Sequence, residues 1–289
     1  MDYSAFWKPL TQLYEAGEAK AIARLVMEVR FGLSMTDILC GKIALLPAGD
    51  QQILEDIQQR LLAGEPVQYV LGQAAFGGHT FYVAPGVLIP RPETEELCRW
   101  VVEDESFKTE EDGCAILDIG TGSGCIACTL AAALPQARVT AWDISDDALR
   151  IAAENARRIG VNVTFEKTDI LNYPPSSFLP PPSSLLPPFS LIVSNPPYIC
   201  NKERATMDRN VLEHEPEQAL FVPDDDPLLF YRAIARYAVK ALRPGGMLFF
   251  EINPLYVGAL QQMLRNEGFA STEVRTDQFG KQRFTKSWL

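Results

Sequence analysis

Apolar residues in the first part of the chain recur at intervals of three and four. Within residues 1–64, Ile22, Val26 and Val29 follow this spacing, and comparable positions continue on either side of them. Such spacing puts apolar side chains on one face of a helix, so it predicts short amphipathic helices. We expect residues 1–74 to form a small helical-bundle domain.

Turn and cap signals mark the helix ends of this bundle and its boundary with the rest of the chain. Ser34-Met35-Thr36-Asp37 has the form of a capping box, and Gly64 is a stop signal for the helix before it. Between residues 75 and 90, β-branched and aromatic residues punctuated by glycine predict a β-hairpin that links two domains. Pro92 and Glu93 then predict the first turn of a new helix.

Beyond Gly113 the pattern changes to short apolar runs that alternate with helical stretches. This alternation is typical of an α/β fold in which helices cover both faces of a parallel sheet, and we expect it over residues 91–289. The turn Arg243-Pro244-Gly245-Gly246 is expected to precede the strand at residues 247–252. The other expected strands are residues 115–119, 139–142, 163–166, 191–194, 271–275 and 283–288.

Charge and composition narrow the classes of function. The 289 residues carry a net charge of −11, which disfavours a nucleic-acid substrate because a phosphate backbone would be repelled. The six cysteines follow no regular framework, and neither a secretion signal nor a membrane-length apolar run is present. We expect a cytoplasmic monomer with no membrane or metal partner. Seven prolines in residues 174–188 predict an irregular surface loop.

A glycine-rich turn follows the first expected strand of the α/β part. Gly120-Thr121-Gly122-Ser123-Gly124 comes directly after the strand and enters a helical stretch. Glycines in this context let the backbone approach a nucleotide-like ligand closely. Asp143, at the end of the next strand, is placed to bind ribose hydroxyls. On spacing alone, a nicotinamide-dependent enzyme and a methyltransferase both stay open.

Two details favour S-adenosylmethionine as the cofactor over a dinucleotide. The glycines do not follow the dinucleotide order G-x-G-x-x-G, and Asp118 stands just before them, where a carboxylate suits a cationic ligand. Asp169, at the end of a strand expected at residues 165–169, is placed to reach the adenine end of the ligand, with Ile170 beside it. The alternative is that Asp143 and Asp169 only cap the helices after their strands.

The motif Asn195-Pro196-Pro197-Tyr198 follows a buried strand, at the edge where α/β sheets form their ligand crevice. The prolines fix the backbone, and the asparagine offers both an acceptor and donors. A planar –NH₂ group could donate to the Asn195 oxygen and the Pro196 carbonyl, with its face against the Tyr198 ring. Positioning of a neutral nitrogen beside a methyl donor can supply most of the acceleration.

With these motifs the chain resembles the peptide chain release factor N5-glutamine methyltransferase family. The resemblance rests on the glycine turn, on residues 195–198, on residues 88–95 (LIPRPETE) and on His214-Glu215-Pro216, and it covers nearly the full length. It implies a Rossmann-like class I methyltransferase domain that modifies the glutamine of the Gly-Gly-Gln tripeptide in class I release factors, with the helical domain gripping the partner.

The resemblance also implies roles for particular residues. Residues 120–124, Asp143 and Ile170 would line the S-adenosylmethionine pocket, and residues 195–198 would hold the glutamine amide. Arg91, Pro92 and Glu93 would lie on the rim of the pocket. The family's usual Glu-Ile-Gly is Glu251-Ile252-Asn253 here, which puts the local shape of the pocket in question.

Other functions and sites weigh less. An N6-adenine methyltransferase would use the same motif on a flipped base, but the acidic charge counts against it. An oxidoreductase has no use for Asn195 and Pro196, and a cofactor-binding scaffold would need a blocked crevice. Three further features are expected to be structural: Cys125 and Cys128 as packing residues, His214 as a hydrogen-bonding residue, and residues 224–226 as a solvated acidic loop.

Overall fold

The computed structural model describes residues 1–104, 113–173 and 189–289, so the loop expected at residues 174–188 lies outside the described residues. The described chain divides into two compact units. The first comprises residues 1–73, 83–85 and 207–215, and the second comprises residues 74–82, 86–206 and 216–289. All six cysteines are free thiols. No helix in the described part of the chain has the length and apolarity needed to cross a membrane.

The first unit is helical, as its periodicity predicts. Its elements are α1 (Tyr3–Leu10), α2 (Ala16–Phe31), α3 (Met35–Leu39), η1 (Lys42–Leu45), α4 (Ala48–Leu62), α5 (Val67–Leu71) and α9 (Arg209–His214). The capping box at Ser34 is confirmed, because the Ser34 hydroxyl accepts from the Asp37 backbone and the Asp37 carboxylate accepts from the Ser34 backbone. In the core, the Gln58 amide donates to the carbonyls of Ala5 and Phe6, which ties α4 to α1.

The second unit is built on a seven-stranded sheet in the order β10-β11-β9-β6-β3-β4-β5. Its strands are β3 (Ala115–Ile119), β4 (Arg138–Asp143), β5 (Val163–Lys167), β6 (Phe189–Ser194), β9 (Leu242–Glu251), β10 (Ser271–Thr276) and β11 (Gln282–Trp288). Strands β9, β6, β3, β4 and β5 run parallel, whereas β11 is antiparallel to β9 and to β10. The predicted parallel α/β sheet is therefore confirmed, with an antiparallel edge.

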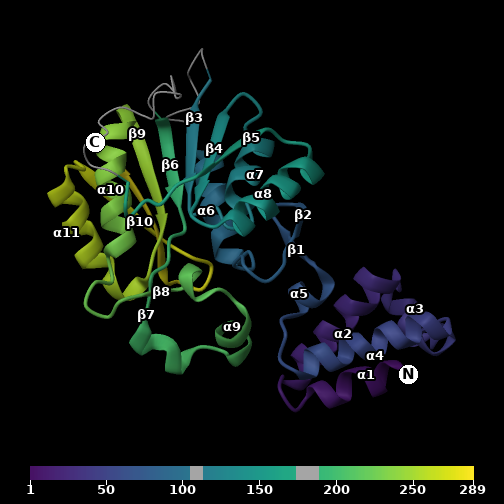
Figure 1. The fold of residues 1–289 in the computed structure, drawn as a ribbon. Helices are drawn as coiled ribbons and strands as arrows, with labels where there is room; N and C mark the ends of the chain where they lie inside the picture. Colours follow the sequence, from purple (N-terminus) through teal and green to yellow (C-terminus); the bar gives the residue numbers. More distant parts are fainter. Residues whose placement is uncertain (105–112, 174–188) are drawn as a thin grey trace. The chain divides into compact units, whose positions relative to one another are not determined.

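Helices cover both faces of this sheet (Figure 1). On one face pack α6 (Pro92–Glu103), α7 (Cys125–Ala133) and α8 (Asp146–Ile159), and on the other pack α10 (Leu229–Ala241) and α11 (Val257–Glu267). Successive residues of β3 alternate between the two cores, with Ile116 in the first and Leu117 in the second. This alternation explains why the buried strands read as continuous apolar runs.

The predicted hairpin is present as β1 (Gln73–Phe76) and β2 (His79–Tyr82). Its rings Phe76 and Phe81 are buried in the core beneath α6, α7 and α8, where they meet edge to face with centroids 5.9 Å apart. Because those rings belong to the core of the second unit, the strands of the hairpin are more than a linker.

The turn expected at residues 243–246 interrupts β9 (Leu242–Glu251) instead of preceding it, and Gly245 there has a φ of 75°. Leu242 and Met247 both lie in β9, and they pair with Phe189 and Leu191 of β6. Six residues of β9, Leu242 to Met247, therefore lie opposite three residues of β6, Phe189 to Leu191, so β9 is irregular between these two pairs. Sequence analysis also missed a small parallel sheet of β7 (Ile199–Cys200) and β8 (Phe221–Val222), with η2 (Asn201–Thr206) and η3 (Glu217–Ala219) between them and η4 (Pro254–Tyr256) after β9.

Candidate functional site at the carboxyl edge of the sheet

The glycine turn between β3 and α7 is held to the neighbouring strand β4. The backbone amides of Gly120 and Thr121 both donate to the Trp142 carbonyl, at 2.8 and 2.9 Å. Gly120, Gly122 and Gly124 have φ values of 75°, 54° and 79°, in the left-handed region that residues other than glycine rarely adopt. The turn is therefore fixed by the backbone itself and needs glycine at all three positions.

The three glycines differ in what surrounds them. A Cβ added at Gly120 or Gly122 would meet no atom within 4 Å, whereas one at Gly124 would lie 2.9 Å from the Ala152 Cβ. Gly124 thus lets α7 approach α8 closely. Gly120 and Gly122 leave open space of the kind that a ligand needs.

Asp118 holds the turn from beneath. Its carboxylate accepts from the Thr121 hydroxyl at 2.6 Å and from the Ala127 backbone amide at 3.2 Å, both through Oδ2. Its Oδ1 is buried with no hydrogen-bond partner among the described residues. Burial raises the pKa of the Asp118 carboxyl to about 7, against which the two hydrogen bonds work. The Asp118 carboxyl is therefore buried directly below the turn, and no basic side chain in the described part of the chain is among the causes of its pKa shift.

Asp143 joins the glycine turn to the start of α8. Its Oδ2 accepts from the Gly122 amide and its Oδ1 from the Ser145 amide, each at 2.9 Å. The cap of α8 is Ser145, whose hydroxyl accepts from the Ala148 amide, so Asp143 is not only a helix cap. Burial raises the pKa of Asp143 as well.

Asp169 does not end a strand, because β5 stops at Lys167. Its carboxylate accepts from the backbone amides of Leu171 and Asn172 and from the Asn172 side chain, which makes it the organiser of a local turn. Ile170 packs against the core under α10 and α11. The helix-capping alternative does not apply to Asp169, because residues 170–173 form no helix, and its contact with the cofactor stays a prediction.

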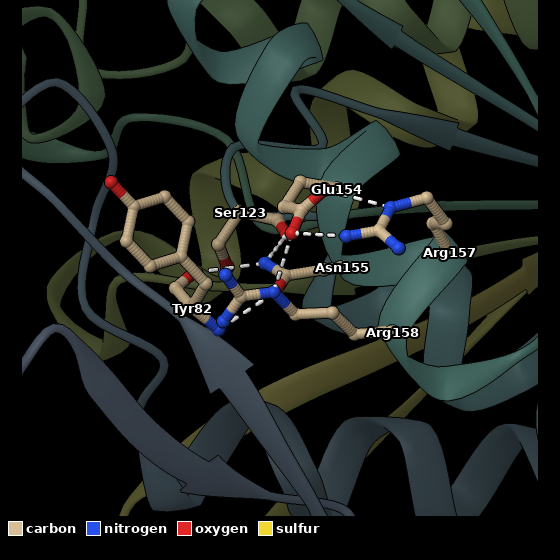
Figure 2. Close-up of polar contacts among 6 residues, drawn as sticks. All are labelled: Tyr82, Ser123, Glu154, Asn155, Arg157 and Arg158. Carbon is tan, nitrogen blue, oxygen red and sulfur yellow. Dashed lines mark hydrogen bonds and ion pairs between the residues drawn. The ribbon is translucent and has the colours of Figure 1, made fainter.

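Asn155 is a structural residue of the site that sequence analysis missed (Figure 2). This buried side chain on α8 donates to the carbonyls of Tyr82 and Ser123 and accepts from the Tyr82 amide, at 2.6 to 2.9 Å. It therefore connects the glycine turn to the hairpin strand β2. A lone asparagine within an amphipathic helix gives no sequence signal for such a role.

Residues 195–198 follow β6 at the same edge of the sheet as the glycine turn, since β6 and β3 are parallel neighbours. The Asn195 side chain is half-buried, and its Nδ2 donates to the Thr94 hydroxyl at 3.0 Å. Its Oδ1 accepts no hydrogen bond from any described residue. The Asn195 side chain thus presents its oxygen as an acceptor, while its amino group is already hydrogen-bonded to Thr94.

Behind the motif lies a buried carboxylate that sequence analysis did not single out as functional. Glu251, the last residue of β9, accepts from the Thr94 hydroxyl at 2.7 Å and from the Tyr198 hydroxyl at 3.0 Å. Its backbone carbonyl accepts from the Tyr231 hydroxyl. Burial raises the pKa of the Glu251 carboxyl. Burial also raises the pKa of the Tyr198 hydroxyl well above its usual value, and the Glu251 charge adds to this second shift. Within residues 91–94, Thr94 accepts a hydrogen bond from Asn195 of the motif, and Glu93 interacts electrostatically with Tyr198.

Asn253, the departure from the family pattern, takes part in the site. Its Nδ2 donates to the Tyr198 carbonyl at 3.1 Å and to the Glu203 carboxylate, and its Oδ1 accepts from the Leu255 amide. The substitution thus adds a side-chain tether to the last residue of the motif.

Charge indicates which ligand the glycine turn fits. The pKa values of Asp118 and Asp143 are both raised by burial, and no basic side chain of the described residues is among the causes of either shift. A cationic ligand would favour the charged forms of these two carboxyl groups, whereas the pyrophosphate of a dinucleotide would disfavour them. The open space above Gly120 and Gly122 and the unpartnered Asp118 oxygen therefore fit S-adenosylmethionine.

Of the features expected to be structural, the cysteines are confirmed as packing residues, because Cys128 lies in the core and Cys125 packs against it. His214 is expected to form a hydrogen bond, but its Nε2 is buried without a hydrogen-bond partner among the described residues, so the expectation is wrong for this atom. In the acidic loop, Asp226 forms a two-point ion pair with Arg232, so it is not merely solvated.

Family models match both parts of the chain. One described as a methyltransferase domain matches residues 110–275, and one described as the PrmC N-terminal domain matches residues 10–72. The release factor glutamine methyltransferase of Bacteroides thetaiotaomicron is 45% identical over 274 residues, which are 95% of this chain and 94% of that protein. The protein of the same name from Flavobacterium psychrophilum is 38% identical over 281 residues, covering 97% and 95%.

Solved structures share the fold at low identity. The human methyltransferase 10 domain containing protein matches with a TM-score of 0.53 and 19% identity, covering 73% of this chain and 88% of that one. The 16S rRNA N2 G1207 methyltransferase of T. thermophilus, solved with AdoMet and guanosine, matches with a TM-score of 0.52 and 18% identity, covering 75% and 49%. At these identities the likeness shows the fold alone.

Proposed function

The chain belongs to the release factor glutamine methyltransferase family, and from that premise we propose that it methylates the glutamine side-chain amide in the Gly-Gly-Gln motif of class I release factors. S-adenosylmethionine, when bound, supplies the electrophilic methyl group. The residues that would hold it are Gly120, Thr121, Gly122, Ser123, Gly124, Asp143, Asp169 and Ile170, and Asn195 would line the pocket beside the transferred methyl group without contributing much of the affinity.

The observation that carries the proposal is the one-sided hydrogen bonding of Asn195. Its amino group is held by Thr94, and its oxygen has no partner among the described residues. A primary amide brought to this edge could donate one hydrogen to that oxygen and the other to the Pro196 carbonyl. Two acceptors on the two hydrogens would direct the amide plane and raise the electron density on nitrogen.

The proposed site orients the substrate amide without using a charged base. Pro196 and Pro197 restrict the backbone, and the Tyr198 residue is fixed at both ends, by the Glu251 carboxylate at its hydroxyl and by Asn253 at its carbonyl. A rigid, neutral clamp contributes by positioning, for which effective molarities on the order of 10⁵ M are attainable. The methylated nitrogen carries a positive charge until it loses a proton, so that proton is acidic and leaves to solvent after the transfer.

A labelling assay tests the proposal. Purified protein is incubated with methyl-labelled S-adenosylmethionine and a class I release factor, its Gly-Gly-Gln glutamine→Ala variant, or duplex DNA. We expect label on the unaltered release factor alone. Equal label on both release factors would place the methyl elsewhere, and label on DNA would favour the adenine methyltransferase alternative.

A further inference from the structure

The side chains behind Asn195 form a chain of hydrogen bonds with a defined direction. Asn195 Nδ2 lies 3.0 Å from the Thr94 hydroxyl oxygen, which lies 2.7 Å from Glu251 Oε2. Thr94 and Glu251 are each only 2% exposed, so solvent does not compete for these bonds. Asn195 comes directly after β6, Thr94 lies in the first turn of α6, and Glu251 ends β9.

The direction follows from counting hydrogens. A threonine hydroxyl has one hydrogen, and an ionised carboxylate can only accept, so the Thr94 hydrogen points to Glu251. The Thr94 oxygen must then accept from Asn195, which turns the amino group of Asn195 inward. The Asn195 oxygen is consequently left facing away from Thr94.

We propose that Glu251, acting through Thr94, is a positioning residue that sets the direction of the Asn195 carboxamide and so leaves its oxygen available to the substrate amide. This inference rests on the proposed function and deepens it. It concerns a residue that does not touch the substrate. The same carboxylate also accepts from the Tyr198 hydroxyl, so one group would orient both ends of the motif.

Protonation of Glu251 would reverse the direction of the chain. A carboxyl O–H can donate to Thr94, and the Thr94 hydrogen can then donate to the Asn195 oxygen once the carboxamide has flipped, which removes the acceptor from the substrate side. Burial raises the pKa of Glu251, while Thr94, Tyr198 and Arg283 oppose this. The titratable and charged groups that interact with Glu251 are Glu93 and Cys98 on α6, Cys125 on α7, Tyr198, Tyr231 on α10 and Arg283 on β11.

The first test removes the central hydroxyl. Thr94→Val keeps the shape of the side chain, and we expect it to lower kcat on the release factor about tenfold or more at unchanged KM for S-adenosylmethionine. Thr94→Ser restores the hydroxyl and should bring kcat to within about threefold of the wild-type value. Thr129→Val is the matched control, because Thr129 is also buried but its hydroxyl has no partner among the described residues. A Thr94→Val kcat equal to that of Thr129→Val would overturn the inference.

The second test follows ionisation without relying on activity. The side-chain ¹⁵N–¹H resonances of Asn195, assigned by their loss in Asn195→Ala, should shift as acidic pH protonates Glu251. That shift should be absent in Glu251→Gln, and kcat of this variant should lack the corresponding acidic limb. Asn195 resonances that shift with pH in the same way in the wild type and in Glu251→Gln would overturn the inference.

The two tests separate this inference from the proposed function. If the wild-type protein methylates no release factor but the Asn195 resonances respond to Glu251→Gln and Thr94→Val as stated, the proposed function fails and the positioning role stands. If methylation occurs and neither the resonances nor kcat respond, the positioning role fails and the function stands. Melting temperatures of all variants show whether a loss of kcat reflects unfolding.

Discussion

At the scale of single residues, the proposed chemistry depends on which hydrogen bonds are already satisfied. The Asn195 amino group is held by Thr94, whereas Asp143 uses both of its oxygens on backbone amides. The first arrangement leaves an acceptor for a substrate, and the second fixes the turn against which a cofactor would lie. The two residues should therefore respond differently to substitution.

Asn195→Ala should abolish turnover and spare cofactor binding. The variant loses the acceptor oxygen but leaves the glycine turn and Asp143 in place, so we expect kcat to fall at least about a hundredfold while the Kd for S-adenosylhomocysteine stays within about threefold. Calorimetry measures the Kd, and single-turnover assays measure the rate. A parallel loss of affinity and rate would mean that Asn195 chiefly shapes the cofactor pocket.

The buried carboxyl of Asp118 should make stability depend on pH. Its pKa is about 7 in the folded protein against 3.8 for the unperturbed group, so its contribution to stability is complete below pH 3.8 and is lost as the pH rises to 7. Relative to Asp118→Asn, which keeps an accepting oxygen, the free energy of unfolding of the wild type should fall by ~4 kcal/mol across this window. Urea unfolding of both proteins without cofactor measures this difference. Curves that run parallel from pH 4 to pH 8 would contradict it.

At the scale of elements, the sheet aligns the ends of several strands at one edge, and short segments after those ends supply the chemistry. The glycine turn follows β3, Asp143 ends β4, residues 195–198 follow β6, and Glu251 ends β9. Since these strands are parallel neighbours, their carboxyl ends meet at one edge. Each element therefore contributes one part of the site.

Three alanine substitutions separate backbone strain from packing and from ligand contact. Gly122→Ala and Gly160→Ala both place a side chain at positive φ in open space, whereas Gly124→Ala also meets Ala152. We expect similar losses of about 1–2 kcal/mol for the first two and a larger loss for Gly124→Ala. Only Gly122→Ala and Gly124→Ala should weaken cofactor affinity.

Thermal unfolding and calorimetry with S-adenosylhomocysteine check these expectations. Gly160 is the control, because it ends α8 away from the turn and shares only the positive φ. Unchanged affinity in Gly122→Ala would show that the open space above this glycine is not used by the cofactor.

The sequence predicts what depends on local pattern and fails where distant segments meet. The strand at residues 115–119 and the capping box at Ser34 are predicted correctly, because periodicity and cap chemistry are local. The insertion of β11 between β9 and β10 and the irregularity in β9 depend on pairing across the sheet. The roles of Thr94 and Asn155 could not be predicted for the same reason, since their hydrogen-bond partners lie far away in the chain.

At the scale of the whole molecule, the chain combines a helical unit with a unit that carries the proposed site. We propose that residues 1–74 recognise the release factor, that residues 75–90 link the two domains, and that residues 91–289 perform the transfer. In the helical unit, Leu39 at the end of α3 and Leu45 at the end of η1 are 77% and 80% exposed. Large apolar side chains held in solvent are candidates for contact with a protein partner.

Replacing both leucines should affect recognition and leave chemistry intact. Leu39→Ser with Leu45→Ser should raise KM for the full release factor severalfold and leave kcat unchanged. A short Gly-Gly-Gln peptide, which is too small to reach a separate recognition surface, serves as the control substrate. An equal rise in KM for the peptide would contradict a separate recognition role for these residues.

Tandem mass spectrometry of a release factor after incubation with S-adenosylmethionine and the protein tests the central claim most directly. A clamp that selects a primary amide should put a single methyl group on the side-chain nitrogen of the Gly-Gly-Gln glutamine, and Asn195→Ala should leave that peptide unmodified. A methyl group on any other residue, or an equally modified peptide from Asn195→Ala, would contradict the account.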